Sequence, residues 1–342
     1  MFELPANADR EAVLNRLRSD PRVESAQPLN SFNVLTSPTS STLPSAPTVA
    51  SPDATANAEA GGSNDPYRNL QRNLDTMDVT QAHRRSRGEG VRIAIIDTGI
   101  DGTHPDLAGR IASFKDVTDE QGPEHSMERH GTAVAGVIAA VENNQVGIVG
   151  IAPASRLHGF RACWPETTNA AGAVCNTFTL AKALTAAIEA RVDIVNLSLT
   201  GPMDPLLTRI VDIGQKRDIV FVGAVAPHGT GSTFPTSIDG VINVDAVGAG
   251  PSTDAILLAP GTDVLTLVPE GRYDFISGSS LAAASVSGGI ALLRARERHL
   301  SAAQAQRILS ETTRTVTTAG GAAASIDLCS AVNVVLREPP CS

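Results

Sequence analysis

Three short segments of the chain carry side chains that could take part in catalysis. Asp97-Thr98-Gly99 closes an apolar run, His130-Gly131-Thr132 opens an apolar helical stretch, and Ser280 lies among small residues at the start of another. A carboxylate, an imidazole and a hydroxyl are the groups from which enzymes build an activated nucleophile. Each also has a plain structural interpretation, since Asp-x-Gly is common in turns and Ser often caps a helix. Catalysis therefore requires a fold that brings the three together.

Four near-continuous apolar runs are typical of strands buried on both faces of a parallel sheet. They span residues 91–96, 192–197, 218–222 and 240–244, and helical stretches occupy 132–140, 179–190, 205–216 and 281–299. This alternation predicts an α/β domain with a doubly wound, mostly parallel sheet and helices on both faces. Reactive groups in such folds gather at the carboxyl ends of the strands, and Asp97 ends the first run.

The order Asp, His, Ser along the chain matches one known type of nucleophilic triad. The neighbouring residues strengthen the match: Thr103-His104-Pro105-Asp106-Leu107, Gly150-Ile151-Ala152-Pro153 and Gly278-Ser279-Ser280-Leu281-Ala282-Ala283. On these motifs, residues 64–300 resemble the subtilisin-like serine proteases, or subtilases. The resemblance implies a subtilisin-like fold and a serine endopeptidase acting on peptide or protein substrates. Asp97, His130 and Ser280 would form its triad and pass through an acyl-enzyme intermediate.

The chain departs from this family where the oxyanion should be stabilised. Subtilases place an Asn after a strand as an amide donor, and the matching residue here is Pro227. Proline has neither a side-chain donor nor an N–H. The remaining donor is the Ser280 N–H, helped by the Ser279 hydroxyl or by His228. Loss of one oxyanion donor slows turnover about 100- to 1000-fold, so we expect a slow enzyme.

The resemblance also implies a substrate-binding edge. Ser198-Leu199-Thr200-Gly201 is similar to the segment to which subtilases add the substrate as an extra strand, through main-chain hydrogen bonds. Thr233 lies at the expected floor of the first specificity pocket. Thr200 and Thr233 replace glycines of the family, so we expect small or medium apolar residues before the cleaved bond. The alternative for this segment is an ordinary loop after a buried strand.

Calcium is the expected ion. Two carboxylates and a loop resemble the strong calcium site of thermitase-like subtilases, and calcium prefers six to eight oxygen ligands. The implied ligands are Asp65, Asp106, the Asn144 amide oxygen and the carbonyls of Val141, Val146 and Ile148. The alternative is a plain Asn-Asn turn beside two solvated carboxylates.

The N-terminal region is expected to be a separate unit. Residues 1–35 contain a helical pattern over 9–19, which Asp9 can cap, and an extended stretch over 23–35. They resemble the second half of the subtilase inhibitory prodomain, a small α+β unit that serves as inhibitor and folding aid. Residues 36–62 are rich in Ser, Thr, Pro and Ala and predict a flexible, cleavable linker, and 63–342 form the catalytic domain. We therefore expect a zymogen, with a signal peptide and the first half of the prodomain upstream of Met1.

The four cysteines form two local pairs, Cys163 with Cys175 and Cys329 with Cys341, each 12 positions apart. No Cys-x-x-Cys spacing occurs, so a structural zinc site is not expected. We interpret the pairs as two disulfides, one of three possible connectivities, and four buried free thiols are the alternative. Disulfides form in oxidising compartments, so they favour a secreted or periplasmic protein.

Composition excludes other classes of function. The 342 residues are 42% hydrophobic and carry a net charge of −9, which argues against a nucleic-acid or anionic-membrane partner. Aromatic residues make up only 3%, too few for stacking on single-stranded nucleic acid. No apolar run is long enough for a transmembrane helix.

Two other functions compete with an active protease. A pseudoprotease that binds a peptide or partner without cleaving it is favoured by Pro227 and opposed by the intact Asp97, His130 and Ser280. An α/β-hydrolase esterase would need Gly-x-Ser-x-Gly after a strand and the order Ser, Asp, His, so the motifs argue against it.

Overall fold

The computed structural model describes residues 4–5, 7–35, 63–118, 127–166, 169–227, 233–248, 256–318, 321–339 and 341. The predicted linker, 36–62, and His228 lie outside these residues. Within the described ranges, no helix combines the length and the apolar character that crossing a membrane would require.

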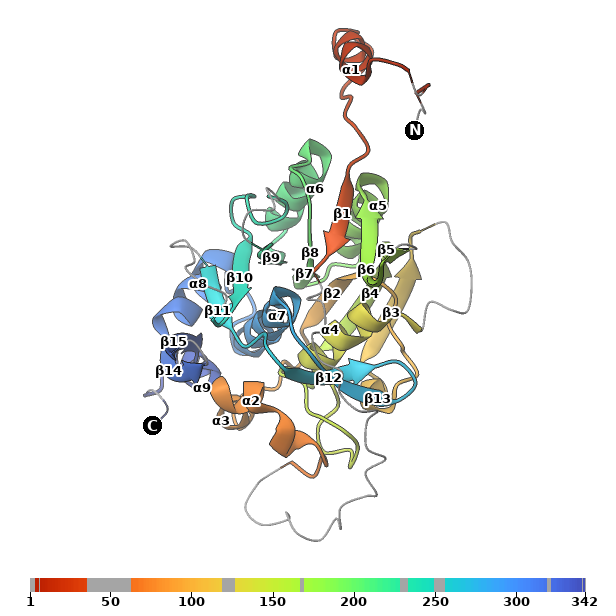
Figure 1. The fold of residues 1–342 in the computed structure, drawn as a ribbon. Helices are drawn as coiled ribbons and strands as arrows, with labels where there is room; N and C mark the ends of the chain where they lie inside the picture. The colour runs from red at the N-terminus through yellow and green to blue at the C-terminus, as the bar shows by residue number, and fades with distance from the viewer. Residues whose placement is uncertain are drawn as a thin grey trace.

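A seven-stranded parallel sheet forms the centre of the molecule (Figure 1). The strand order is β11-β10-β9-β7-β2-β4-β3, and every neighbouring pair is parallel. From β2 the chain runs to β3 at one edge and back to β4, then crosses to β7 and winds outward through β9, β10 and β11, which is the predicted doubly wound arrangement. The strands are β2 (Arg92–Asp97), β3 (Ile111–Asp116), β4 (Arg156–Arg161), β7 (Ile194–Leu197), β9 (Val220–Ala224), β10 (Ile242–Ala246) and β11 (Ile256–Ala259).

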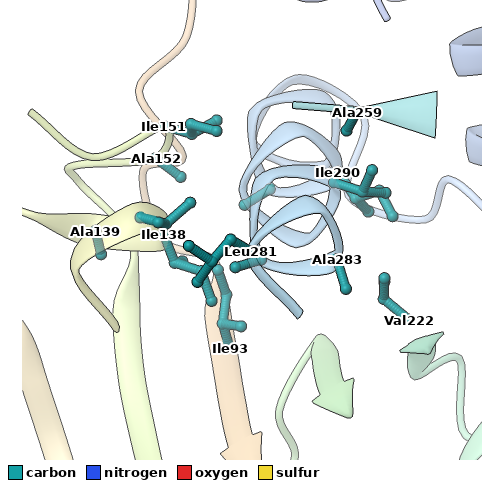
Figure 2. Close-up of a cluster of buried hydrophobic side chains, with 14 of the residues drawn as sticks. Ile93, Ile138, Ala139, Ile151, Ala152, Val222, Ala259, Leu281, Ala283 and Ile290 are labelled. Carbon is teal, nitrogen blue, oxygen red and sulfur yellow. The ribbon is translucent and has the colours of Figure 1, made fainter. Parts of the chain in front are cut away.

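The sheet separates two apolar cores. Ile93 and Ile95 of β2 belong to one core, and Ala94 and Ile96 belong to the other, because successive side chains of a strand point to opposite faces. Helices α4 (Arg129–Ala139) and α7 (Ser279–Arg296) cover the first face, and α5 (Thr177–Glu189) and α6 (Pro205–Gln215) cover the second. Figure 2 shows the first core, with Leu281 of α7 beside Ile138 of α4 and Ile93.

These four helices match the predicted ones to within a few residues at their ends. The side chain of Asn176 caps α5 by accepting from the N–H groups of Phe178 and Thr179. Asp204 caps α6, which has proline at its first position, where no N–H is needed. Helix α4 begins three residues earlier than predicted, so His130 lies inside its first turn.

A second sheet contains a strand from the N-terminal region. Its order is β5-β6-β1-β8, and β1 (Ser31–Val34) is antiparallel to both β6 (Asn169–Asn176) and β8 (Leu199–Thr200). β5 (Cys163–Glu166) pairs with β6. Helix α1 (Arg10–Arg18), capped by Asp9 as predicted, lies apart from the rest of the molecule in Figure 1. Of the extended stretch predicted over 23–35, only residues 31–34 form a strand.

The remaining elements pack around this framework. Both predicted disulfides are present: Cys163–Cys175 joins β5 to β6, and Cys329–Cys341 joins the last helix to the C-terminal segment. The other elements are η1 (Arg68–Leu70), α2 (Arg72–Thr76), α3 (Val79–His83), η2 (Pro105–Leu107), β12 (Val264–Val268), β13 (Arg272–Ile276), α8 (Ala302–Glu311), β14 (Thr313–Thr318), β15 (Gly321–Ile326) and α9 (Leu328–Leu336).

Candidate active site

The carboxyl end of β2 and the first turns of two helices hold the three predicted catalytic residues. Asp97 is the last residue of β2, His130 is the second residue of α4, and Ser280 is the second residue of α7. Gly131 permits the close approach of α4 to the turn after β2. A Cβ at that position would lie only 2.6 Å from the carbonyl oxygen of Gly99.

Asp97 and His130 are in direct contact. The Nδ1 atom of His130 lies 2.8 Å and 2.9 Å from the two carboxylate oxygens of Asp97, and both side chains are buried. With an ionised Asp97, Nδ1–H is the donor, which leaves Nε2 as a proton acceptor. Nε2 is buried and has no hydrogen-bond partner among the described residues.

The hydroxyl of Ser280 contacts a peptide carbonyl from the N-terminal region. Its Oγ donates to the carbonyl oxygen of Leu35 at 2.8 Å. The main-chain N–H of Leu35 donates to the carbonyl of Ser198 at 3.2 Å. The residue just after β1 is therefore tied both to the predicted nucleophile and to the predicted substrate-binding edge.

The predicted edge binds β1 as an additional strand. Asn33 pairs with Thr200, and Val34 pairs with Leu199, while β6 pairs with the other side of β1. The segment is thus held between β6 and β8, and its pairing with β8 is the hydrogen-bonding mode expected for an extended peptide.

Two further residues, Phe234 and Gly201, enclose a side chain of this strand. Phe32 is fully buried and stacks edge-to-face on Phe234, with ring centroids 5.2 Å apart. A Cβ at Gly201 would lie 2.2 Å from Cδ1 of Phe32, so the glycine makes room for the ring. Thr233 donates its N–H to the Gly201 carbonyl at 2.9 Å, and its side chain is exposed.

A buried ion pair beside Asp97 and His130 was not foreseen. Glu128 immediately precedes α4 and accepts a hydrogen bond from the N–H of Gly99. Arg161, at the end of β4 and opposite Asp97 in register, donates from Nη2 to Glu128 Oε1 at 2.7 Å. The pair ties the turn after β2 to the start of the helix that carries His130. The available signal was an arginine ending an apolar strand and a glutamate two positions before the histidine.

Two of the predicted oxyanion residues, Ser279 and Ser280, open α7. Ser280 is in the first turn of α7, where amide N–H groups have no acceptor within the helix. The Ser279 hydroxyl is already engaged, since it donates to the Val225 carbonyl at 2.8 Å. Pro227 lies three residues after β9 and is exposed. His228 lies outside the described residues.

The predicted calcium ligands converge on one loop. Asp65 accepts from the N–H groups of Asn143 and Asn144 at 2.7 Å and 3.0 Å. Asp106 accepts from the N–H of Ile148 at 2.9 Å and from Tyr273 Oη at 3.1 Å. The amide nitrogen of Asn144, rather than its oxygen, faces Asp106 at 2.8 Å, and Val141 donates its N–H to the Asp106 carbonyl.

The chemistry of this loop fits a calcium ion. Both carboxylates are buried, and burial raises the pKa of Asp106 to about 6, with the charge of Asp65 adding to the effect. A cation would offset this cost of holding two buried carboxylates close together. The described residues hold no cluster of three or more His, Cys, Asp or Glu side chains suited to a metal. Carbonyl oxygens, including those expected from Val141, Val146 and Ile148, would have to complete the coordination.

Comparisons with known proteins agree with these motifs. A sequence model described as the subtilase family matches residues 88–325. A thermophilic serine proteinase from Bacillus sp. (strain AK1) is 31% identical over 299 residues, which cover 84% of this chain and 67% of that relative. Thermitase from Thermoactinomyces vulgaris is 28% identical over 249 residues, covering 70% of this chain and 87% of that protein.

A solved structure shows the same fold. Fervidolysin from Fervidobacterium pennivorans, a keratinolytic enzyme related to subtilisin, superposes with a TM-score of 0.68 at 23% identity. The match covers 81% of this chain and 47% of that one, so the chain spans about half the length of fervidolysin. The fold class predicted from the apolar runs is therefore confirmed.

Proposed function

Because the chain belongs to the subtilase family of serine proteases, we propose that it is a secreted endopeptidase that uses Ser280, His130 and Asp97. Ser280 is the nucleophile, His130 the general base and then general acid, and Asp97 the carboxylate that orients the imidazole. The contact between Asp97 and Nδ1 of His130 at 2.8 Å supports this assignment, since it leaves Nε2 free to accept a proton.

The chemical steps follow from these groups. The Ser280 hydroxyl turns away from the Leu35 carbonyl oxygen and gives its proton to Nε2 of His130. Its Oγ atom then bonds to the carbonyl carbon of the peptide bond that is cleaved. The oxyanion is stabilised by the Ser280 N–H in the first turn of α7. His130 then protonates the leaving amine as the carbon–nitrogen bond breaks, and the acyl group stays on Ser280. A water molecule gives a proton to His130 and attacks this acyl group, and His130 returns the proton to Ser280 as the acid product leaves.

One observation carries the proposal. The Ser280 Oγ atom lies 2.8 Å from the Leu35 carbonyl oxygen, at the end of a strand held between β6 and β8. We therefore propose that the enzyme cleaves its own chain between Leu35 and Thr36. On this proposal residues 1–35 are a prodomain that inhibits by occupying the site and aids folding, residues 36–62 are a linker, and 63–342 are the catalytic domain. Leu35 agrees with the expected preference for a medium-sized apolar residue before the cut.

Incubation of the full chain tests the proposal. We expect the wild type to release a fragment ending at Leu35, identified by mass spectrometry, and to react with a fluorophosphonate afterwards. Ser280→Ala should do neither, and Asp97→Asn should slow cleavage by about 10,000-fold, because the imidazole would hold the wrong tautomer. Equal fragmentation of wild type and Ser280→Ala would refute the assignment of Ser280.

A second candidate is a pseudoprotease that holds a peptide without cleaving it. It is favoured by Pro227 in place of the amide donor and by the Ser280 hydroxyl, which donates to Leu35 and not to His130. Folded wild-type chain that remains intact and also fails to label at Ser280 after addition of the phosphonate would support this function over hydrolysis.

A further inference from the structure

A buried carboxylate lies three residues after Gly201, the last residue of the predicted substrate-binding edge. Asp204 precedes α6 and is fully buried. Its Oδ1 accepts from the N–H groups of Leu206 and Leu207, both at 3.1 Å, and its Oδ2 accepts from Thr177 Oγ1 at 2.7 Å. No arginine or lysine forms a salt bridge with Asp204 in the described part of the chain, so its hydrogen bonds come from neutral donors.

Two of those donors are carboxamides of the N-terminal segment. Nε2 of Gln27 donates to Asp204 Oδ1 at 2.7 Å, and Nδ2 of Asn30 donates to Oδ2 at 2.9 Å. Relative to the bond after Leu35, Asn30 is the sixth residue before the cut and Gln27 is the ninth. The contacts of the N-terminal segment thus extend well beyond β1, the strand that pairs with β8.

Main-chain hydrogen bonds hold this part of the segment in place. The N–H of Asn30 donates to Thr177 Oγ1 at 2.9 Å, and the N–H of Thr177 donates to the Asn30 carbonyl at 3.0 Å. Thr177 is the first residue of α5, so the segment crosses the N-terminal ends of α5 and α6. The backbone of Asn30 is therefore positioned independently of its side chain.

The surroundings select an amide over other side chains. Gln27 uses both ends of its amide, because Oε1 accepts from the N–H of Leu206 at 3.1 Å while Nε2 donates to Asp204. A carboxylate at either position would repel Asp204, and an ammonium group in place of the Gln27 amide could not accept from the N–H of Leu206. Two helix N-terminal ends also disfavour a full positive charge.

We infer that Asp204 is a specificity-determining residue, which with the first turns of α5 and α6 binds carboxamide side chains six and nine residues before the cleaved bond. The inference rests on the proposed cleavage after Leu35 only for this numbering of positions. It explains how the enzyme recognises its own N-terminal segment, and it predicts that peptide substrates with Asn at the sixth position bind best.

Amide hydrogen exchange in the full-length Ser280→Ala chain tests the inference without any need for catalysis. In Asn30→Asp, the lost charge-assisted hydrogen bond and the new repulsion should lower protection of residues 29–35 by about 10- to 100-fold. Asn33→Asp is the matched control, since Asn33 is exposed on the same strand, and it should change protection less than about threefold. Unchanged exchange in α7 would show that the fold is intact.

Exchanging the carboxylate at position 204 and the carboxamide at position 30 should restore the hydrogen bond between them. Asparagine is also a good helix cap, so Asp204→Asn combined with Asn30→Asp reverses the donor and acceptor while keeping α6 capped. We expect the double variant to recover protection to within about threefold of the parent. Equal loss in Asn30→Asp and Asn33→Asp, or no recovery in the double variant, would overturn the inference.

Peptide hydrolysis provides a second measurement. Wild-type chain that has cleaved itself should hydrolyse a peptide of residues 24–39 with a kcat/KM at least about 10-fold higher than the same peptide with Asn30→Asp. If it hydrolyses no peptide, the proposed protease function fails, while the exchange comparison still decides the role of Asp204.

Discussion

At the scale of single residues, the neighbours of the proposed catalytic groups determine how well each group is supported. The imidazole of His130 is oriented by Asp97, and the turn that carries Asp97 is in turn held by Glu128, which pairs with the buried Arg161. On the oxyanion side, Pro227 lies at the position where the family resemblance predicts an amide donor, and the Ser279 hydroxyl donates to the Val225 carbonyl. On our proposal, the contact between Asp97 and His130 supports activation of Ser280, whereas a second oxyanion donor has no such support.

Pro227→Asn should raise turnover. The new amide would contact the oxyanion only in the transition state, so kcat should rise by about 10-fold or more while KM changes little. Steady-state kinetics on an apolar fluorogenic peptide measure both constants. Pro227→Ala is the matched control, because it removes the ring without adding a donor. A gain shared by both variants would indicate loop mobility as its cause and contradict the oxyanion explanation.

His83 makes stability depend on pH. It is buried in α3 and donates from Nε2 to the Ile151 carbonyl at 2.9 Å, and burial lowers its pKa to about 4. Between pH 6.5 and 4 the unfolded chain binds this proton and the folded chain does not, so the free energy of unfolding falls as pH falls.

Comparison with His83→Gln isolates this contribution, since glutamine keeps an N–H donor and does not titrate. Between pH 7 and pH 4, the free energy of unfolding should fall by about 3 kcal/mol more in the wild type than in His83→Gln. Urea unfolding in the Ser280→Ala background measures this difference. Parallel pH profiles for the two proteins would contradict a depressed pKa at His83.

At the scale of elements, the pairing of β1 supports the proposal that an extended peptide binds at the predicted substrate-binding edge. β1 lies between β6 and β8, and its residue Phe32 fills the space left by Gly201 against Phe234. Main-chain pairing accepts any sequence, whereas the closed space around Phe32 and the carboxylate of Asp204 discriminate among side chains. If the chain is cut after Leu35 as proposed, the selectivity of this edge comes from positions four, six and nine residues before the cut.

Gly201→Ala should slow self-cleavage after Leu35 by about 10-fold or more, because the new methyl group would overlap Phe32. The rate is measured by following the fragment that ends at Leu35 over time. Combining it with Phe32→Ala removes the overlap, so the double variant should cleave faster than Gly201→Ala alone. If the second substitution slows cleavage further, Gly201 acts by another route than space for Phe32.

At the scale of the whole molecule, distant segments are tied together at several points. Two disulfides close local loops, and the carboxylates of Asp65 and Asp106 join two separate segments of the chain to the loop at 141–148. A bound calcium ion would join the same segments, and a ligand that binds only the folded state stabilises it.

Chelation of calcium should lower the melting temperature of the full-length Ser280→Ala chain. At a calcium concentration 100 times the dissociation constant, the bound ion contributes about 2.7 kcal/mol, which amounts to several degrees. Thermal unfolding with EGTA or with excess calcium measures the difference. Asp65→Asn should reduce the effect of calcium, and a melting temperature insensitive to EGTA in the parent chain would rule out a structural calcium ion.

The sequence by itself determined the α/β class, the four main helices and the identity of the three candidate catalytic residues. Apolar periodicity and capping residues are local properties, and short motifs can be recognised without coordinates. It did not reveal that Leu35 meets Ser280, that Arg161 pairs with Glu128, or that Asn30 meets Asp204. The two residues of each pair lie 245, 33 and 174 positions apart. Such contacts depend on the order of strands in the sheets, which sets non-local neighbours and leaves no periodic signal in the chain. Only the tertiary structure could decide them.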